Sequence, residues 1–328
     1  MIDQLAFLPE PVLRMLVTVP PALSAGLAAV LAALVLGSVA AAVLVRRNPE
    51  RWADLPPRMG SWWVICLLLG AALLLGAQAT IALFALISFI ALREFVTLAP
   101  TRREDRPVVL LAFAAVPIAY GAVWIDNYAF FLTLIPVYLF LMMAFAMAWI
   151  GRTEKFLATA GILYWGVVAC VTNIAYAPFL MRVPADEAGP AGPAGLVFFL
   201  LAVTQINDVA QYIWGRSFGR QRITPLVSPN KTWAGALGGW ATTAALIWFA
   251  GPFFTPLELL PLAILAAALP VAGFAGDITM SAIKRDLGVK DTGTLLPGHG
   301  GALDRLDSLT FTAPLYFHIL AFFAVDRF

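Results

Sequence analysis

Ten long apolar segments run along the chain, separated by short polar stretches. Each is close to the length of about 20 residues that a helix needs to cross a bilayer. The pattern therefore predicts an all-α integral membrane protein, a polytopic bundle of about ten transmembrane helices. The second and third segments meet at residues 76–78, where we expect a tight hairpin rather than one broken helix. The predicted segments are 22–45, 61–77, 78–97, 107–124, 127–150, 155–179, 194–214, 233–252, 257–275 and 308–325.

Composition excludes a soluble helical protein. Hydrophobic residues make up 61% of the 328 residues and charged residues only 12%, whereas soluble domains have about 45–50% apolar and about 25% charged residues. The two cysteines, Cys66 and Cys170, lie in apolar runs and are expected to be small buried side chains rather than a disulfide. Charged residues at positions 3, 10 and 14 precede the first apolar run, so we expect no cleavable signal peptide.

The basic residues are distributed unevenly along the chain. If the segments alternate in direction, 18 of the 21 Lys and Arg residues fall on one side of the membrane. Cytoplasmic loops carry an excess of Lys and Arg, so this side is predicted to face the cytoplasm and both termini to face away from it. The net charge of +2 is too small for a nucleic-acid-binding protein, which concentrates basic residues into a strong patch.

An external loop rich in Pro and Gly, residues 184–195, divides the chain. Residues 1–183 are interpreted as scaffold-like transmembrane helices and residues 194–328 as the catalytic transmembrane region, which holds nearly all the unusual polar residues. We expect helices of both halves to pack together. Arg93 and Glu94, at the end of the third segment, are interpreted as an ion pair at the membrane interface.

The connection between the ninth and tenth segments holds the densest group of charges. Spacing places Asp277, Ser281 and Lys284 on one helical face, and Asp304 and Asp307, three residues apart, on one face of another helix. Carboxylates interleaved with cations suit a site for a hard metal ion such as Mg²⁺ together with phosphate. The group comprises Asp277, Asp286, Asp291, Asp304, Asp307, Lys284, Arg285, Lys290, Arg305 and His299.

Three glycines surround His299 in the run 297–301. Consecutive amide groups in such turns form anion-binding concavities. Together with a metal ion and basic side chains, they indicate phosphoryl or nucleotidyl transfer. The alternative is a solvated loop with surface ion pairs. His299 by itself is ambiguous, since it could orient phosphate, transfer a proton or bond a backbone carbonyl.

A second polar stretch lies upstream. Asp208 is predicted near the cytoplasmic end of the seventh segment, and residues 228–232 open the eighth helix. Ser228 and Thr232 could cap that helix, or its N-terminus beside Lys231 could bind phosphate. The glycines at 235, 238 and 239 permit either close helix packing or close approach of a ligand.

Residues 281–308, named here the signature segment, resemble the signature of the phosphatidate cytidylyltransferases. The matching elements are Ser281, Lys284-Arg285, Lys290-Asp291, His299-Gly300-Gly301, Asp304-Arg305 and Asp307. Gly276-Asp277 and the runs 207–216 and 228–239 extend the similarity, which covers about residues 200–310. Ala234 stands where the family usually has Glu, and Val209 and Gln211 replace small or hydroxyl residues. The chain is therefore interpreted as a divergent branch.

The resemblance implies a multi-pass protein of the cell (inner) membrane with its active site facing the cytoplasm. Its reaction would be the transfer of a cytidylyl group from CTP to phosphatidate, with Mg²⁺ as cofactor. A homodimer is one assembly open to such a chain, and the sequence leaves the oligomeric state undecided. The implied metal ligands are Asp277, Asp304 and Asp307; the further catalytic residues are Lys284, Arg285 and His299; the substrate-binding residues are Ser228, Asn230, Lys231, Thr232, Lys290, Arg305 and Asp208.

Two other functions stay open. One is nucleotidyl or phosphoryl transfer to a different lipid or to a polyprenol, suggested by Ala234. The other is an ion-coupled transporter that uses Asp208 and Asp277. Transporters carry such residues near the bilayer midplane on broken helices, whereas these two are predicted at helix ends, so transport is the less favoured reading.

Overall fold

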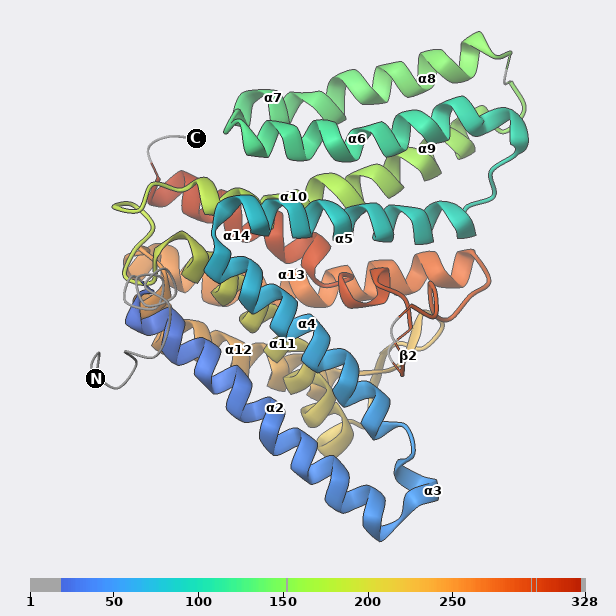
Figure 1. Ribbon diagram of the computed structural model, residues 1–328. Coiled ribbons are helices and arrows are strands. Elements are labelled where there is room, and N and C mark those ends of the chain that lie inside the picture. The colour runs from blue at the N-terminus through green and yellow to red at the C-terminus, as the bar shows by residue number, and fades with distance from the viewer. Residues whose placement is uncertain (1–18, 152, 296, 299, 326–328) are drawn as a thin grey trace, which may run out of the picture.

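The computed structural model describes residues 19–151, 153–295, 297–298 and 300–325, and these are almost entirely helical (Figure 1). All ten predicted apolar segments are found as helices. Eight are continuous: α2 (Pro21–Arg47), α4 (Leu55–Leu75), α5 (Ala77–Leu98), α6 (Arg106–Trp124), α11 (Gly192–Phe218), α12 (Trp233–Phe254), α13 (Leu259–Asp286) and α14 (Leu309–Phe323).

The other two segments are interrupted by π-helical turns. One consists of α7 (Tyr128–Thr133), η3 (Leu134–Leu139) and α8 (Phe140–Trp149), the other of α9 (Phe156–Val167), η4 (Val168–Thr172) and α10 (Asn173–Phe179). In η3 the wider turn falls at Pro136, which cannot donate a backbone hydrogen bond. Short elements complete the chain: α3 (Pro49–Trp52), η2 (Arg103–Asp105), η5 (Leu180–Arg182), η6 (Leu303–Arg305), and the antiparallel strands β1 (Arg222–Thr224) and β2 (Ser228–Thr232).

The chain is a polytopic membrane protein. Over the described ranges, nine helical stretches are long and apolar enough to cross a membrane, and α14 is a shorter apolar helix of 15 residues. The predicted hairpin between the second and third segments is confirmed. Gly76 adopts φ 98°, a conformation that favours glycine, and the chain reverses there from α4 into α5 (Figure 1).

The connections rich in Lys and Arg gather at one end of the bundle. Figure 1 shows α3, β2 and the α8–α9 connection at this end, and the start of α2 and the end of α14 at the opposite end. We name it the basic end. Its position agrees with the alternation predicted from the charge pattern.

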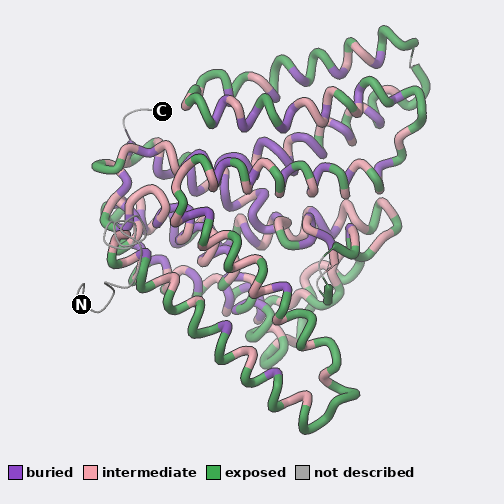
Figure 2. The backbone as a smooth tube through the Cα atoms, viewed as in Figure 1, coloured by how far each residue is buried: buried purple, intermediate pink, exposed green. Residues whose placement is uncertain are grey.

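The two halves of the chain pack together, as expected. Helix α10 packs along α14, and α2 and α4 contact α11. Aromatic rings form part of the α10–α14 contact, with ring centroids of Tyr176 and Phe317 5.2 Å apart and those of Phe179 and Phe317 5.5 Å apart. Helices α10 and α14 are among the most buried parts of the chain, while α2, α3 and α8 are largely exposed (Figure 2).

The glycines that follow residue 233 serve helix packing, one of the two roles left open. A Cβ atom built on Gly239 would lie 2.3 Å from Cγ of Gln211, and one on Gly238 would lie 2.4 Å from the Trp214 ring. Gly235 similarly faces Gly215 on α11. Helices α11 and α12 therefore approach each other closely through these small residues.

Gly239→Ala is expected to destabilise the protein by about 1–3 kcal/mol, because the added methyl group would meet backbone and Cγ atoms of Gln211. Gly161→Ala is the matched control, since a Cβ atom there meets nothing within 4 Å. Thermal unfolding in detergent should show a lower midpoint for the first variant alone. Equal midpoints would contradict the close packing of α11 on α12.

Candidate active site

Two of the predicted site residues lie inside helices rather than at their ends. Helix α11 continues to Phe218 and α13 to Asp286, so Asp208 and Asp277 lie about ten and nine residues before those ends. The predicted ends at 214 and 275 were wrong because hydropathy marks where apolar side chains stop, while backbone hydrogen bonding continues through polar residues.

Three carboxylates, Asp208 on α11, Asp277 on α13 and Asp307 before α14, form an acidic cluster. The Ser308 hydroxyl donates to Oδ1 of Asp208 at 3.0 Å, and the Ser308 amide donates to Oδ1 of Asp307 at 2.8 Å. Burial, followed by the negative charges of Asp277 and Asp208, raises the pKa of Asp307 to about 8. The negative charges of the three carboxylates are thus not fully balanced by nearby positive charges.

Gly276 allows this cluster to form. A Cβ atom at this position would lie 2.5 Å from the carbonyl oxygen of Asp307 and 3.2 Å from the ring of Phe311. Only a glycine beside Asp277 lets the chain that carries Asp307 approach α13 so closely.

Lys231 supplies the cation nearest to the cluster. Its ammonium group pairs with Oδ2 of Asp277 and donates to Oε1 of Gln211 at 3.2 Å. The divergent residue Gln211 therefore helps to orient Lys231. Thr232 caps α12 by accepting from the Gly235 amide at 3.2 Å, which is one of its two predicted roles. Ser228 and Asn230 lie in β2, before the helix begins.

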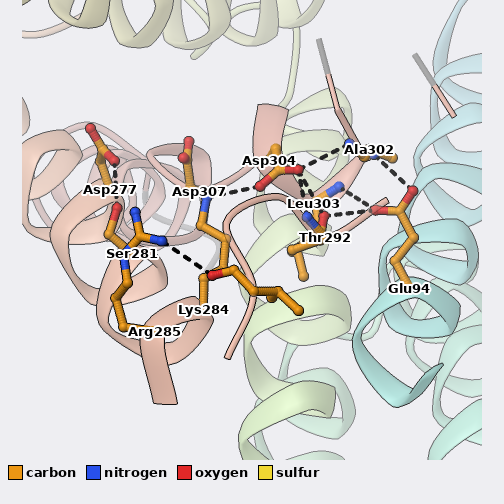
Figure 3. A network of polar contacts seen from close by, with 12 residues as sticks. Glu94, Asp277, Ser281, Lys284, Arg285, Thr292, Ala302, Leu303, Asp304 and Asp307 are labelled. Carbon is orange, nitrogen blue, oxygen red and sulfur yellow. Dashed lines mark hydrogen bonds and ion pairs between the residues drawn. The ribbon is translucent and has the colours of Figure 1, made fainter. Parts of the chain in front are cut away.

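Asp304 forms a separate centre and is almost fully satisfied by hydrogen bonds (Figure 3). Lys284 donates to its Oδ1 at 2.8 Å, and this ion pair is largely buried. Its Oδ2 accepts from the Gly301 amide at 2.9 Å and from the amide and hydroxyl of Thr292 at 2.8 and 3.1 Å. Burial alone would raise the pKa of Asp304, but Lys284 and these amides outweigh it and lower the pKa.

Asp304 and Asp307 do not lie together on one helical face, so the predicted helix over these residues was wrong. The 3₁₀ turn η6 ends at Arg305, and α14 begins only at Leu309. The turn directs Asp304 toward Lys284 and Thr292, while Asp307 faces the acidic cluster. The two carboxylates are therefore held in different environments.

Glu94, at the end of α5, contacts the signature segment and was missed as a functional residue. It accepts hydrogen bonds from the Thr292 hydroxyl at 3.1 Å, the Ala302 amide at 2.9 Å and the Leu303 amide at 3.0 Å (Figure 3). The expected role, an ion pair with Arg93 at the membrane interface, gave no hint of these contacts. Its only sequence signal is a carboxylate that follows an apolar run.

Four described amides of the signature loop, residues 291–303, donate to carboxylates of the protein, and of these only Gly301 belongs to the run 297–301 predicted to bind an anion. The Gly301 amide donates to Asp304, and the Ala302 and Leu303 amides donate to Glu94. These buried contacts contradict the alternative of a simple solvated loop. Gly298 and Gly300 have φ of 75° and 82°, which favours glycine. His299 lies outside the described residues.

The remaining predicted cations lie around this centre. Arg285 donates to the carbonyl oxygens of Val227 and Val289, both at 3.3 Å, and so joins α13 to the β1–β2 connection. Lys290 and Arg305 are exposed at the basic end. Lys231 and Lys284 thus lie close to the acidic carboxylates, and exposed surface cations are available to an anionic substrate.

The donor set fits Mg²⁺ only together with a substrate. Within the described ranges, no three Asp, Glu, His or Cys side chains are grouped closely enough to hold a metal ion. Mg²⁺ commonly binds one or two carboxylates and completes its shell with substrate phosphates and water. Asp307, which is repelled by the neighbouring carboxylates, matches that requirement best. Asp277 is paired with Lys231 and accepts a long hydrogen bond of 3.4 Å from Ser281, so it would join Asp307 by exchanging Lys231 for the metal ion. Asp304 is buried and accepts hydrogen bonds on both oxygens, three of them on Oδ2.

Comparisons with known proteins identify relatives of this chain. The uncharacterized protein YnbB of Escherichia coli is 38% identical over 301 residues, which is 92% of this chain and 99% of that protein. Phosphatidate cytidylyltransferases of Brucella suis and Pseudomonas aeruginosa are 42% and 41% identical over 132 and 128 residues. Those matches cover 39% and 38% of this chain and 47% of each relative, so the chain spans about half the length of these enzymes.

The match to a family is broader than the match to these enzymes. Residues 56–323 match the cytidylyltransferase family, so the similarity includes α4, α5 and Glu94 as well as the signature segment. The transporter alternative is thereby set aside, and the chain is a membrane nucleotidyltransferase that belongs to the cytidylyltransferase family.

Proposed function

We propose that this protein transfers a cytidylyl group from CTP to phosphatidate, forming CDP-diacylglycerol and pyrophosphate. The observation that carries the proposal is the acidic cluster of Asp208, Asp277 and Asp307 beside Lys231, at the basic end of a membrane bundle. Such a site can meet a membrane lipid and a soluble nucleotide together. The Brucella and Pseudomonas relatives are phosphatidate cytidylyltransferases, which supports the choice of phosphatidate.

The proposed reaction is a direct displacement. An oxygen of the phosphatidate phosphate attacks the α-phosphorus of CTP and forms a new P–O bond. The bond between the α-phosphorus and its bridging oxygen breaks, and pyrophosphate leaves with that electron pair. The nucleophile is already an anion, so no covalent enzyme intermediate is needed, and catalysis consists mainly of positioning and charge stabilisation.

Asp277 and Asp307 are the residues that would hold Mg²⁺, which would neutralise phosphate charge when bound. Asp304, also expected as a ligand, fits better as the group that positions Lys284, because it is buried and its Oδ2 already has three donors. Asp277 is more accessible, and its main partner is the single cation Lys231. Lys231 and Lys284 would hold phosphate oxygens, and the exposed cations Lys290 and Arg305 would attract the nucleotide. All these residues come from one copy of the chain.

The excess of Lys and Arg at the basic end supports a site that faces the cytoplasm of the inner membrane. CTP is a soluble anion that would arrive from that side. Labelling of single cysteines in cells would test this orientation: a cysteine in place of exposed Lys290 should react with an impermeant thiol reagent only after the inner membrane is opened. Labelling in intact spheroplasts would place the site on the other face.

The substrates can be tested with purified protein in nanodiscs, labelled CTP and Mg²⁺. We expect a labelled lipid when phosphatidate is present and none when phosphatidate is replaced by a polyprenyl phosphate. The reverse result would favour the related polyprenol transferase, the alternative suggested by Ala234.

Asp307→Asn should lower turnover at least about 1000-fold, because it removes a charge that the reaction needs at the acidic cluster. The variant should keep its unfolding midpoint, since Asp307 is repelled by its neighbours in the folded protein. Asp286→Asn, which changes an exposed carboxylate at the end of α13, is the matched control and should keep near-normal turnover. Near-normal turnover of Asp307→Asn in saturating Mg²⁺ would refute the metal assignment.

A further inference from the structure

Glu94 joins the N-terminal helices to the signature loop. It lies on α5, about 200 residues before the loop in the chain, yet both of its carboxylate oxygens accept hydrogen bonds there. Oε1 accepts from the Ala302 amide, and Oε2 accepts from the Leu303 amide. The Thr292 hydroxyl lies 3.1 Å from Oε2 and shares its one proton between Glu94 and Asp304. The contact therefore holds both ends of the loop at once.

The space around the carboxylate is closely fitted. A Cβ atom on Gly301 would lie 2.4 Å from Oε2 of Glu94, and one on Gly293 would lie 3.0 Å from its Oε1. Neither glycine has a positive φ, so close contacts rather than backbone conformation favour glycine here. For Gly301 these contacts are Glu94 together with the Thr292 hydroxyl, also 2.4 Å from the added Cβ, and the Gly293 nitrogen at 2.8 Å. The two glycines thus allow the signature loop to pack closely against the Glu94 carboxylate.

Thr292 connects Glu94 with Asp304. Its hydroxyl lies 3.1 Å from Oε2 of Glu94 and 3.1 Å from Oδ2 of Asp304, and its amide donates to Asp304 at 2.8 Å. Asp304 in turn pairs with Lys284 on α13. One chain of contacts therefore runs from α5 through the loop to α13, as Figure 3 shows.

We propose that Glu94 is a positioning residue for the transfer reaction: it closes the signature loop onto Asp304 and thereby fixes Lys284 and the chain that leads to Asp307. We call the hydrogen bonds from Glu94 to the signature loop the clamp. The kinetic effect of the clamp rests on the proposed function, but the hydrogen bonds themselves do not. Displacement of a reacting group by about 1 Å can lower a rate about 100-fold. The N-terminal half then takes part in catalysis and is not only a scaffold.

Glu94→Gln tests the clamp with little change in shape. The Ala302 and Leu303 amides donate to different oxygens of Glu94, and a glutamine offers one oxygen and one NH₂ group, so it cannot accept both bonds. Glu104→Gln is the matched control, because Glu104 is an exposed carboxylate that follows α5 at the same end of the bundle. Thr292→Val removes only the hydroxyl and provides a milder second variant.

Two measurements on the full-length protein in nanodiscs decide the inference. Amide hydrogen exchange of a peptide that covers residues 290–303 should become at least about 10-fold faster in Glu94→Gln and be unchanged in Glu104→Gln. The kcat with CTP and phosphatidate should fall about 10- to 100-fold in Glu94→Gln, with the KM for CTP changed less than about 3-fold. Thr292→Val should change both quantities in the same direction by less.

Unchanged exchange together with unchanged kcat in Glu94→Gln would overturn the inference. A lower KM for CTP with a retained kcat would also overturn it, since Glu94 would then merely occupy the place of a substrate phosphate. If wild-type protein gave no product from CTP and phosphatidate, the proposed function would fail, and the exchange measurement would still decide the clamp. If Glu94→Gln did not fold, Thr292→Val would decide by the same two readouts.

Discussion

The basic end of this protein depends on the buried charge of Asp304. A carboxylate removed from water costs several kcal/mol unless other groups replace its hydration. Here Lys284 comes from α13, while Thr292 and Gly301 come from the two ends of the signature loop. Because this one side chain needs all three, the loop has one conformation that satisfies it. Some of the charged residues of the segment, Asp304 and Lys284 among them, are therefore required for the structure of the loop itself.

Asp304 and Asp307 are three residues apart, but their surroundings act on them in opposite directions. Hydrogen bonds and Lys284 keep the pKa of Asp304 low, whereas burial beside Asp277 and Asp208 raises that of Asp307. Two carboxylates whose pKa values are pushed apart commonly have different tasks. Asp304, which has its hydrogen-bond partners, maintains the shape of the site. Asp307 lies among negative charges, so it favours the binding of a metal ion that can also hold a polyphosphate.

Hydropathy was sufficient to predict the ten helical segments. The distribution of Lys and Arg was needed in addition to predict the hairpin at Gly76 and the end of the bundle that collects the basic loops. Hydropathy did not predict that α13 continues to Asp286, because polar residues can extend a helix beyond the hydrocarbon. The spacing of Asp277, Ser281 and Lys284 did indicate one helical face, and α13 confirms it. Hydropathy also could not reveal Glu94, since the partners of this carboxylate lie about 200 residues away and two of them are backbone amides. The motif indicated an anion-binding loop, and only tertiary structure identifies the anions as the protein's own side chains.

The helix lengths also fix the depth of the acidic cluster. Counted from the opposite ends of α11 and α13 at 1.5 Å per residue, Asp208 and Asp277 lie about 24 and about 27 Å along their axes. Helix α14, which begins just after Asp307, is about 22 Å long. A hydrocarbon core is about 30 Å thick, so helices that began at its far boundary would carry these carboxylates several ångströms inside its near boundary, beneath the lipid phosphates. A phosphorylated lipid would then react without leaving its leaflet. The nucleotide would have to move from the aqueous side toward the membrane interior to reach the carboxylates.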